Sequence, residues 1–485
     1  MTTEPAPIIV WLRNDLRLAD NPALSDAVAS GAPVVPVFIR EEDAADPWLP
    51  GAASRWWLHG SLERLGEALA RLGSPLVLRS GEPAAVLGAL VQETGAGTVL
   101  WNRRHAPAAM ARDRRVEEEL TARGVTVRSH NAGLLFEPQS VRTKTGGPFK
   151  VFTPFWKALR AMPDPAHPAR APERLVGPAQ PVRSESLEDW GFLPTKPDWA
   201  GGLRETWTPG EAAARERLAD LLDGPVAHYP TLRDRPDTDG TSSLSPHLAF
   251  GEIGPRQIWH AALYAADARP ELAPGIEAFL RELGWREFNH HLLHAFPGLP
   301  DTPLDQRFAR FPWQEDEAGL KAWQRGRTGY PIVDAGMRQL WQTGWMHNRV
   351  RMIVGSFLIK DLLLPWQAGE AWFWDTLVDA DLANNAGNWQ WVAGCGADAA
   401  PFFRVFNPVL QGEKFDPEGD YVRRFVPELA DLPARWIHKP WQAPEGVLRD
   451  AGLRLDVDYP RPIVDHGTAR DRALAAYEGM RKTAN

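Results

Sequence analysis

The chain contains almost no cysteine: Cys395 is the only one among 485 residues. This excludes an intramolecular disulfide framework, a cysteine-rich zinc module and a four-cysteine iron–sulfur cluster. The amino terminus (MTTEPAPIIVWLRNDLRL) lacks the basic start and long apolar stretch of a secretory signal, and no apolar run could span a bilayer. We therefore expect a cytoplasmic protein in a reducing compartment, with no membrane partner.

The common nucleotide-binding and hydrolytic signatures are missing as well. No G-x-G-x-x-G follows an early strand and no G-x-x-x-x-G-K-[ST] occurs, so the usual dinucleotide and triphosphate cradles are absent. H-E-x-x-H and G-x-S-x-G are also absent, which weakens a metalloprotease or α/β-hydrolase interpretation. The net charge of −8 argues against a general polyanion binder, although it allows a local basic groove.

What the chain does have is length and tryptophan. Its length is roughly three times that of a usual single domain, so we expect two or more domains. Twenty-two tryptophans stand against six tyrosines. Any single tryptophan is more often a core or surface residue than a redox element, but their concentration between Trp285 and Trp391 is unusual. Because indole is readily oxidised, stacked indoles there could relay an electron to a buried cofactor.

The first third of the chain alternates between strand-like and helix-like periods. The predicted strands are Ile8–Leu12, Val34–Ile39, Pro75–Leu78, Thr98–Trp101 and Val125–Arg128. The predicted helices are Arg55–Leu72, Pro83–Thr94 and Pro107–Arg123, each ending near a glycine as helix C-caps often do. Strands that alternate with helices predict right-handed βαβ units in a doubly wound parallel sheet.

The pattern changes twice after residue 131, which divides the chain into predicted domains 1–131 and 207–480 and a connector, 132–206. The proline-dense stretch Met162–Pro181 cannot form a helix and predicts an ordered connector over the surface. Beyond it nearly every recognisable segment is helical, so the second domain is predicted to be mostly α. Its predicted helices are Gly210–Leu222, Ile276–His294, Ala318–Gln324, Ile332–Gln342, Arg349–Leu364 and Glu370–Leu377.

The first candidate site is Thr241–His247 (TSSLSPH). Ser245 followed by Pro246 predicts an N-cap and a first-turn proline, so a helix should begin there. A helix start preceded by hydroxyls suits a phosphate, because free N–H groups and the helix dipole favour anions. A capped helix without a ligand is the alternative, and on this motif alone it is the favoured one.

The second candidate is Trp345–Met352 (WMHNRVRM), in a stretch without acidic residues between Asp334 and Asp361. Positive charge beside tryptophan and methionine suits an anionic, aromatic partner such as a nucleic acid or a flavin nucleotide. A solvated basic helix face is the alternative.

The third candidate is Asp379–Trp391 (DADLANNAGNWQW). Its carboxylates, amides and glycine are atypical of a core. Because aspartate and asparagine favour turns over helices, we expect a polar loop that enters a pocket. Metal binding is not expected, since no histidine or third acid lies nearby.

Taken together, these motifs resemble those of the DNA photolyase/cryptochrome family, over nearly the whole chain. Several long matches in the right order are far more specific than any single motif. The segments that carry the resemblance are Trp11–Leu18, Thr241–Leu248, Glu282–Phe288, Gly329–Arg338, Trp345–Met352 and Asp379–Trp391.

The resemblance implies a Rossmann-like antenna domain, a long connector and a helical domain that binds FAD. One set of residues would line the phosphate and ribose side of FAD: Tyr229, Thr241, Ser242, Ser243, Leu244 and Ser245. A second set would surround its isoalloxazine ring: Asn348, Arg351, Asp379, Asp381 and Asn385. Phe279 would add an aromatic contact.

The resemblance also implies light-driven repair of cyclobutane pyrimidine dimers in UV-damaged DNA. Excited, fully reduced FAD would give an electron to the flipped-out dimer, whose ring splits before the electron returns. The residues that would face the lesion are Glu282, Trp285, Arg286, Asn348, Arg349, Met352, Trp391 and Gln411, with Arg233 on the DNA backbone. Trp389, Trp366 and Trp313 match the tryptophan chain that reduces the flavin.

Within the family, the chain looks most like a bacterial class I-type enzyme for cyclobutane dimers. Asn385, at the position that faces flavin N5, matches repair enzymes, and Trp345–Met352 departs from the histidine-containing pattern of (6-4) photolyases. The alternatives are a cryptochrome-type photoreceptor without repair turnover and a DNA-binding flavoprotein without photochemistry.

The presence and the identity of a second, antenna chromophore stay open. Folate-using members of one branch carry an Asn-Glu pair where this chain has Ala108 and Ala109, so a folate bound elsewhere, a deazaflavin, another flavin or no antenna are all compatible. We expect a monomer with a positive groove around Arg233, Arg286, Arg349 and Arg351, and DNA affinity that falls as salt rises.

Overall fold

The computed structural model describes residues 5–42, 46–399, 401–402 and 404–483. Contacts divide the chain into two compact units. The first unit consists of Met1–Ala227, Ser242–Pro297 and Val378–Asp381, and the second of His228–Thr241, Gly298–Leu377 and Leu382–Asn485. In the described part of the chain, no helix combines the length and apolar character that crossing a membrane requires.

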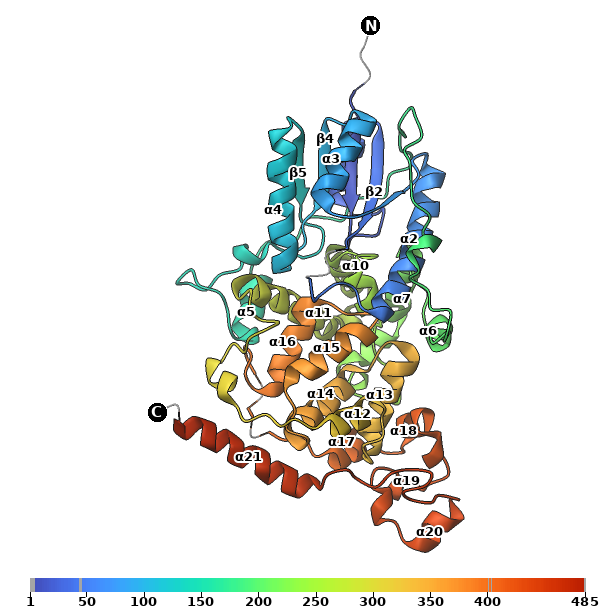
Figure 1. Cartoon of the computed structure of the whole chain (residues 1–485), viewed down its shortest axis with the longest axis vertical. Helices are drawn as coiled ribbons and strands as arrows, with labels where there is room; N and C mark the ends of the chain where they lie inside the picture. Colours follow the sequence, from blue (N-terminus) through green and yellow to red (C-terminus); the bar gives the residue numbers. More distant parts are fainter. Residues whose placement is uncertain (1–4, 43–45, 400, 403, 484–485) are drawn as a thin grey trace. The chain divides into compact units, whose positions relative to one another are not determined.

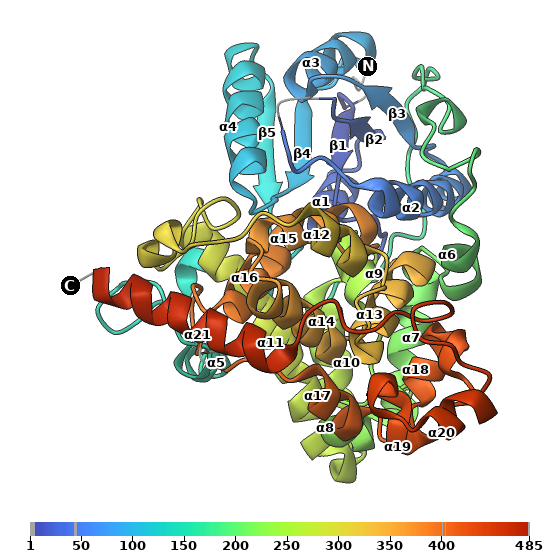
Figure 2. The same ribbon diagram turned by 60° about the horizontal axis from the view of Figure 1, so that its bottom comes forward.

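A five-stranded, wholly parallel sheet with strand order β3-β2-β1-β4-β5 lies in the first unit, and Figure 2 shows the strands side by side. The strands are β1 (Ile8–Leu12), β2 (Val34–Arg40), β3 (Val77–Ser80), β4 (Thr98–Asn102) and β5 (Thr126–His130). β1 is buried along its full length, as expected of a central strand covered on both faces. The predicted doubly wound sheet is confirmed, with each strand within two residues of its predicted start.

The helices between the strands are α1 (Pro22–Ala29), α2 (Ala52–Leu72), α3 (Pro83–Thr94) and α4 (Pro107–Ala122). Gly73 and Gly95 end α2 and α3 in the left-handed conformation, as the sequence predicts. Figures 1 and 2 show α4 beside β5. Alternate strand residues pack with α3 and α4, and in this core the indoles of Trp11 and Trp101 meet edge to face with ring centroids 5.7 Å apart. The eight-residue α1 is too short for its periodicity to be read from the sequence.

The connector contains α5 (Phe152–Arg160) and α6 (Gly201–Thr206), and Met162–Pro181 has no helix or strand, as predicted. Hydrogen bonds hold it along the sheet: Leu175 N–H donates to Leu72 O and Val34 N–H donates to Val176 O, both at 2.8 Å. The connector is therefore an ordered part of the first unit.

The first unit also holds the helices α7 (Glu211–Asp223), α9 (Ser245–Ala249), α10 (Pro255–Ala268) and α11 (Ala273–Ala295). α11 packs closely on its neighbours because it carries glycine at the contacts. A Cβ on Gly284 would lie 2.5 Å from the Trp156 ring, and one on Gly275 would lie 1.8 Å from Val226 O.

The second unit is helical, and among the described residues beyond β5 the only strand-like pairing is an isolated bridge between Leu455 and Tyr459. Its helices are α8 (Tyr229–Leu232), α12 (Glu317–Gln324), α13 (Pro331–Thr343), α14 (Asn348–Ser356) with a π-turn at Phe357–Asp361, α15 (Trp366–Thr376), α16 (Leu382–Ala393), α17 (Pro408–Phe415), α18 (Asp420–Phe425), α19 (Ala434–Ile437), α20 (Glu445–Asp450) and α21 (His466–Thr483).

The expectation of a polar loop at Asp379–Trp391 is wrong for most of that segment. Leu382–Ala393 forms α16, and its buried face includes Ala383, Asn385, Ala386 and Trp389. Packing overrides the turn preference: the Trp389 ring lies against α15, where a Cβ on Gly369 would be 2.1 Å away. The Asn385 side chain also donates to Glu370 O at 3.0 Å, so its amide anchors the helix instead of opening it.

Candidate functional site

The Ser242–Ser245 segment in the first unit enters α9 by a strained route. Ser243 has φ +49°, which non-glycine residues rarely adopt. A helix does begin here as predicted, but the expected cap is wrong: Leu244 is the N-cap residue and makes no side-chain cap hydrogen bond. Ser245 is instead the first helical residue, and its side chain is exposed. Ser242 Oγ accepts the Leu244 N–H at 3.4 Å, just before α9, so no serine caps the helix from the predicted position.

One stretch of α11 carries four of the predicted residues. Phe279 is buried, whereas Glu282, Trp285 and Arg286 are partly exposed. Trp285 stacks on Phe152 with ring centroids 3.8 Å apart, which fixes the plane of its indole. Arg286 donates to Gly133 O at 2.8 Å, so its guanidinium is held against the connector.

A buried carboxyl adjoins Arg286. Glu287 accepts from the backbone of Leu135 at 2.9 Å, and burial raises the pKa of Glu287 to about 7 despite the neighbouring Arg286 cation. This carboxyl therefore changes its protonation near neutral pH, beside a residue predicted to face DNA.

The non-helical residues Val378–Asp381 bring two predicted aspartates into the first unit. Asp379 is buried, and the Asp381 carboxylate lies 3.4 Å from Nε2 of His290 on α11. Among the described residues, no group of three histidine, cysteine, aspartate or glutamate side chains is arranged to hold a metal ion.

In the second unit, the start of α14 gathers the basic residues of Trp345–Met352. Arg349 binds Asp234 at 2.8 Å and lies over the Phe415 ring of α17, 4.4 Å from its centroid. Asp234 adjoins Arg233, and Gln411 is one helical turn before Phe415. The structure thus brings Arg233, Arg349 and Gln411 into one neighbourhood of the second unit, whereas Arg286 of the expected groove belongs to the first.

His347 is the N-cap of α14, and the sequence analysis did not single it out. Its Nδ1 accepts the Arg349 backbone N–H at 3.2 Å, and burial lowers the pKa of His347 to about 4 against the opposing charge of Asp234. The neutral ring therefore carries its proton on Nε2, which is buried and has no hydrogen-bond partner within the described residues. A buried, unpaired donor among arginines suits an anionic or carbonyl oxygen.

The remaining predicted residues of α14 are less buried. Asn348 is exposed at the first helical position, and Met352 lies one turn later, where its sulfur accepts from Arg349 at 3.7 Å. Arg351 donates through Nε to Met346 O at 2.7 Å. The predicted residues of this segment are therefore partly exposed and partly hydrogen-bonded to the loop before α14.

The predicted tryptophans differ in exposure. Trp389 and Trp366 are buried on α16 and α15, whereas Trp313 is partly exposed. Trp366 is one turn before Gly369, which contacts the Trp389 ring, and Gln314 N–H donates to Leu363 O at 2.9 Å, which brings Trp313 near the start of α15. The Phe373 and Trp323 rings also lie near Trp389, at 5.0 and 6.3 Å between centroids.

The predicted site residues are divided between the two units. The first unit holds Ser242, Ser243, Leu244, Ser245, Phe279, Glu282, Trp285, Arg286, Asp379 and Asp381. The second holds Tyr229, Arg233, Thr241, Trp313, Asn348, Arg349, Arg351, Met352, Trp366, Asn385, Trp389, Trp391 and Gln411. Each unit therefore presents its own part of the predicted site.

The carboxyl ends of β1 and β4 flank the point where the strand order reverses, where open parallel sheets usually bind nucleotides. Here protein side chains pair with one another at that point. Arg13 forms a buried ion pair with Asp113, and Asn102 donates to Asp15 at 2.6 Å and to Asn21 at 2.7 Å. Apart from Arg13 Nε, which is buried without a partner among the described residues, these polar groups bind one another.

Comparisons with known proteins agree with the resemblance. A family model described as the FAD binding domain of DNA photolyase matches residues 279–479, and another described as DNA photolyase matches residues 8–173. Deoxyribodipyrimidine photo-lyase from Agrobacterium fabrum is 54% identical over 483 residues, covering 100% of both chains. Cryptochrome-1 from Arabidopsis thaliana is 41% identical, covering 97% of this chain and 70% of its own.

Among solved structures, a bacterial class III photolyase from Agrobacterium tumefaciens has a TM-score of 0.96 at 54% identity, with 99% of each chain covered. This finding does not support the class I-type expectation, because that similar enzyme is of class III. Short motifs shared across the family could not separate these classes.

Proposed function

Because the chain belongs to the DNA photolyase/cryptochrome family, we propose that it is a deoxyribodipyrimidine photo-lyase that repairs cyclobutane pyrimidine dimers in UV-damaged DNA with light and FAD. The observation that carries the proposal is the 54% identity to a photo-lyase over the full length of both chains. The domain division 1–131, 132–206 and 207–480 is part of the proposal, as are a monomeric state and a cytoplasmic location. We also infer a class III type from the similar structure.

The residues present suit FAD chemically. A dinucleotide needs donors for its phosphates, and the Ser242 and Ser243 hydroxyls together with Thr241 and Tyr229 would supply them. A ring with N–H donors and carbonyl acceptors needs partners of both kinds. Asp379 and Asp381 would accept, Arg351 and Asn348 would donate, and Phe279 would add an aromatic contact. The unpaired Nε2–H of His347 supports a ligand oxygen nearby.

Asn385 would lie beside the flavin. Because its amide nitrogen donates to Glu370 O, the orientation of the side chain is fixed and its carbonyl oxygen is left to accept a proton-bearing group. An acceptor held in one position favours a protonated neighbour over an unprotonated one. Asn385 would in this way stabilise the reduced cofactor. Leu244, buried at 2% exposure, would line the phosphate and ribose side of FAD.

On the DNA side, the chain's own residues would bind the damaged strand, orient the flipped-out dimer and exclude water from it. Trp285, held flat by its stack on Phe152, and Trp391 would supply apolar walls, and Met352 would add a polarisable contact. Glu282 would hydrogen-bond a pyrimidine edge, while Arg286, Arg349, Asn348 and Gln411 would hold the surrounding bases and phosphates, with Arg233 on the backbone. Bound FAD supplies the light-driven electron that splits the dimer.

Trp389, Trp366 and Trp313 would carry electrons from the surface to the cofactor. Their exposure supports this order, since the first two are buried and Trp313 is partly exposed. Replacing Trp389 with phenylalanine keeps the ring contact with α15 but removes the readily oxidised indole. Flavin photoreduction should then slow sharply, as followed by absorbance under blue light.

The alternative is a cryptochrome-type photoreceptor, which is favoured by the 41% identity to Cryptochrome-1 from Arabidopsis thaliana. The two functions differ in turnover. Purified, reduced protein should clear thymine dimers from an oligonucleotide under blue or near-UV light but not in the dark. Bound FAD that photoreduces normally while the dimers persist would favour the photoreceptor.

A second chromophore, a folate or a deazaflavin, remains part of the proposal. The ion pair and hydrogen bonds between protein side chains at the β1 and β4 ends argue against its binding at the strand-order reversal. Chromophores extracted from purified protein and separated by chromatography would identify it by absorbance.

A further inference from the structure

The turn Phe250–Glu252 follows α9, the short helix that begins at the segment proposed for the cofactor's phosphates. Neighbouring elements restrain this turn. α9 has only five residues, and its N-cap residue makes no side-chain cap hydrogen bond. Ser243 just before it has φ +49°. A helix this short, with a strained start, does not hold its own conformation, so neighbouring elements must supply the restraint.

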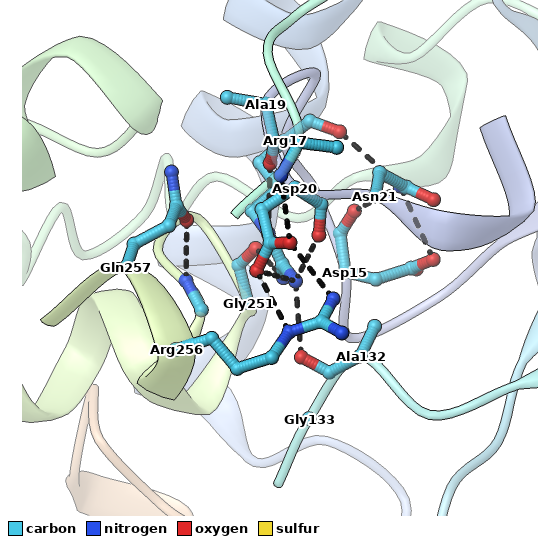
Figure 3. A network of polar contacts seen from close by, with 12 residues as sticks. Asp15, Arg17, Ala19, Asp20, Asn21, Ala132, Gly133, Gly251, Arg256 and Gln257 are labelled. Carbon is cyan, nitrogen blue, oxygen red and sulfur yellow. Dashed lines mark hydrogen bonds and ion pairs between the residues drawn. The ribbon is translucent and has the colours of Figure 1, made fainter. Parts of the chain in front are cut away.

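Arg17, in the loop after β1, supplies one restraint (Figure 3). Its guanidinium donates to Gly251 O at 2.9 Å, to Asp20 O at 2.7 Å and to Ala132 O at 3.0 Å. Arg17 is 1% exposed, and burial lowers its pKa. Asp20 also binds Arg256 of α10 at 2.8 Å. Because a guanidinium is planar with donors in fixed directions, these bonds set the separation of the segments that they join.

The backbone of the turn passes directly against the same loop. Gly251 has φ +65°, and a Cβ there would lie 2.0 Å from Asn14 O, so only glycine fits. Leu16 N–H donates to Phe250 O at 3.1 Å, and the Asn14 side chain donates to Ala249 O at 2.9 Å. The loop therefore contacts three consecutive residues at the end of α9.

Glu252 supplies the second restraint. It is fully buried and accepts from Trp57 Nε1 at 3.1 Å and from Gly210 N–H at 2.7 Å, with Ser61 of α2 as a further donor. Its other carboxylate oxygen meets Nδ1 of His247, inside α9. Helix α2, which follows strand β2, therefore restrains the turn through Glu252. Through the contact of Glu252 with His247 it also restrains α9.

We propose that Asn14–Arg17, in the loop after β1, and α2 form a positioning clamp that, through Gly251 and Glu252, holds Ser242–Ser245 in the conformation that receives the phosphates of FAD. The clamp rests on the proposed function of that segment. Arg17 and Glu252 are positioning residues that act through the turn. The α/β part of the molecule is then required for FAD binding itself, whether or not it carries an antenna.

The test compares Arg17→Met with Arg13→Met in the full-length protein. Arg13 lies in the same Trp11–Leu18 segment and is similarly buried, but it is outside the clamp. Its partners are Asp113 and the Asn102 carbonyl, inside the α/β fold. Reconstitution of FAD, followed by flavin fluorescence, should show a dissociation constant roughly ten-fold or more higher for Arg17→Met. Arg13→Met should bind FAD as the parent does, even where both variants unfold more readily.

Arg17→Lys, which keeps the charge and part of the donor set, should recover part of the affinity. If Arg17→Met does not yield folded protein, Trp57→Phe replaces it, because this change removes one donor to Glu252 and keeps the ring. Equal loss of FAD affinity in the Arg17 and Arg13 variants would overturn the clamp, as would a Trp57→Phe variant with parental affinity.

Ser242→Ala combined with Ser243→Ala separates the clamp from the proposed function beneath it. Unchanged FAD affinity in this double variant would mean that the segment does not bind the phosphates, and the proposed site itself would fail. Weakened affinity there, with parental affinity in Arg17→Met, would reject only the clamp. Weakened affinity in both supports the two proposals together.

Discussion

Two eight-residue segments, Trp11–Leu18 (WLRNDLRL) and Trp345–Met352 (WMHNRVRM), are alike in composition but differ in environment. In the first, Arg13 and Arg17 are 5% and 1% exposed. Every nitrogen of the Arg17 guanidinium donates to a protein carbonyl. Arg13 is bound through both terminal nitrogens, while its Nε has no partner among the described residues. In the second, Asn348 is exposed and His347 keeps a buried N–H without a partner among the described residues.

The difference teaches that basic and aromatic composition does not by itself mark a ligand site. A guanidinium whose donors are all satisfied by protein holds structure together, because it has nothing left to offer a ligand. A side chain with unsatisfied donors near the surface is open to one. Four experiments test this distinction, from the largest expected effect to the smallest.

The largest effect is expected from removing a buried cation of the first segment. Arg17→Met should lower the free energy of unfolding by about 3–5 kcal/mol, because it removes the donor to four buried carbonyl oxygens, those of Ala19, Asp20, Ala132 and Gly251. Arg349→Met should cost no more than about 1 kcal/mol, since its pair with Asp234 is partly exposed. Urea unfolding measures both free energies of unfolding, and equal losses in the two variants would contradict the difference between the segments.

His347 should make the second segment acid-sensitive. Its pKa is about 4 in the folded protein, below the ordinary value of 6.5, so the unfolded chain takes up the proton first as pH falls. The stability from this group is present above pH 6.5 and is lost towards pH 4, by about 2–3 kcal/mol. His347→Asn keeps an N-cap acceptor and removes the titration, so its stability should depend less on pH. Parallel pH profiles for the two proteins would contradict the assignment.

Arg349, which is partly exposed, should matter more for DNA binding than for folding. Arg349→Met should weaken binding to a dimer-containing duplex roughly ten-fold and reduce the salt slope of the affinity by about 1. Fluorescence anisotropy over a range of salt concentrations measures both quantities. Arg13→Met is the control and should leave the slope unchanged. An unaltered slope in Arg349→Met would place that cation outside the DNA contact.

The asparagines of the two segments give the smallest contrast. Asn14→Ala removes a hydrogen bond to Ala249 O and should cost about 1 kcal/mol of unfolding free energy. Asn348→Ala, at an exposed position, should change stability by less than about 0.5 kcal/mol but lower the affinity for FAD or damaged DNA. The reverse ranking in stability would mean that the two segments do not differ as described.

Much of the fold follows from local patterns. Short β-rich runs predict β1 to β5, and the signal is clearest for β1 and β2, which are apolar and buried along nearly their full length. Gly73 and Gly95 mark helix ends, because the left-handed conformation there favours glycine. The short α1 and α5 give too few turns for a period to show, and α16 is hidden by residues that favour turns.

The sequence by itself determined the sheet, the helical remainder and the motifs that carry the family resemblance, because these depend on periodicity and on runs of neighbouring residues. Only the tertiary structure decided that Arg17 binds Gly251, that Glu252 is closed in by α2, and that His347 keeps an unpaired donor. Such partners come from segments up to hundreds of residues apart, and whether a polar group is satisfied depends on which atoms folding brings beside it.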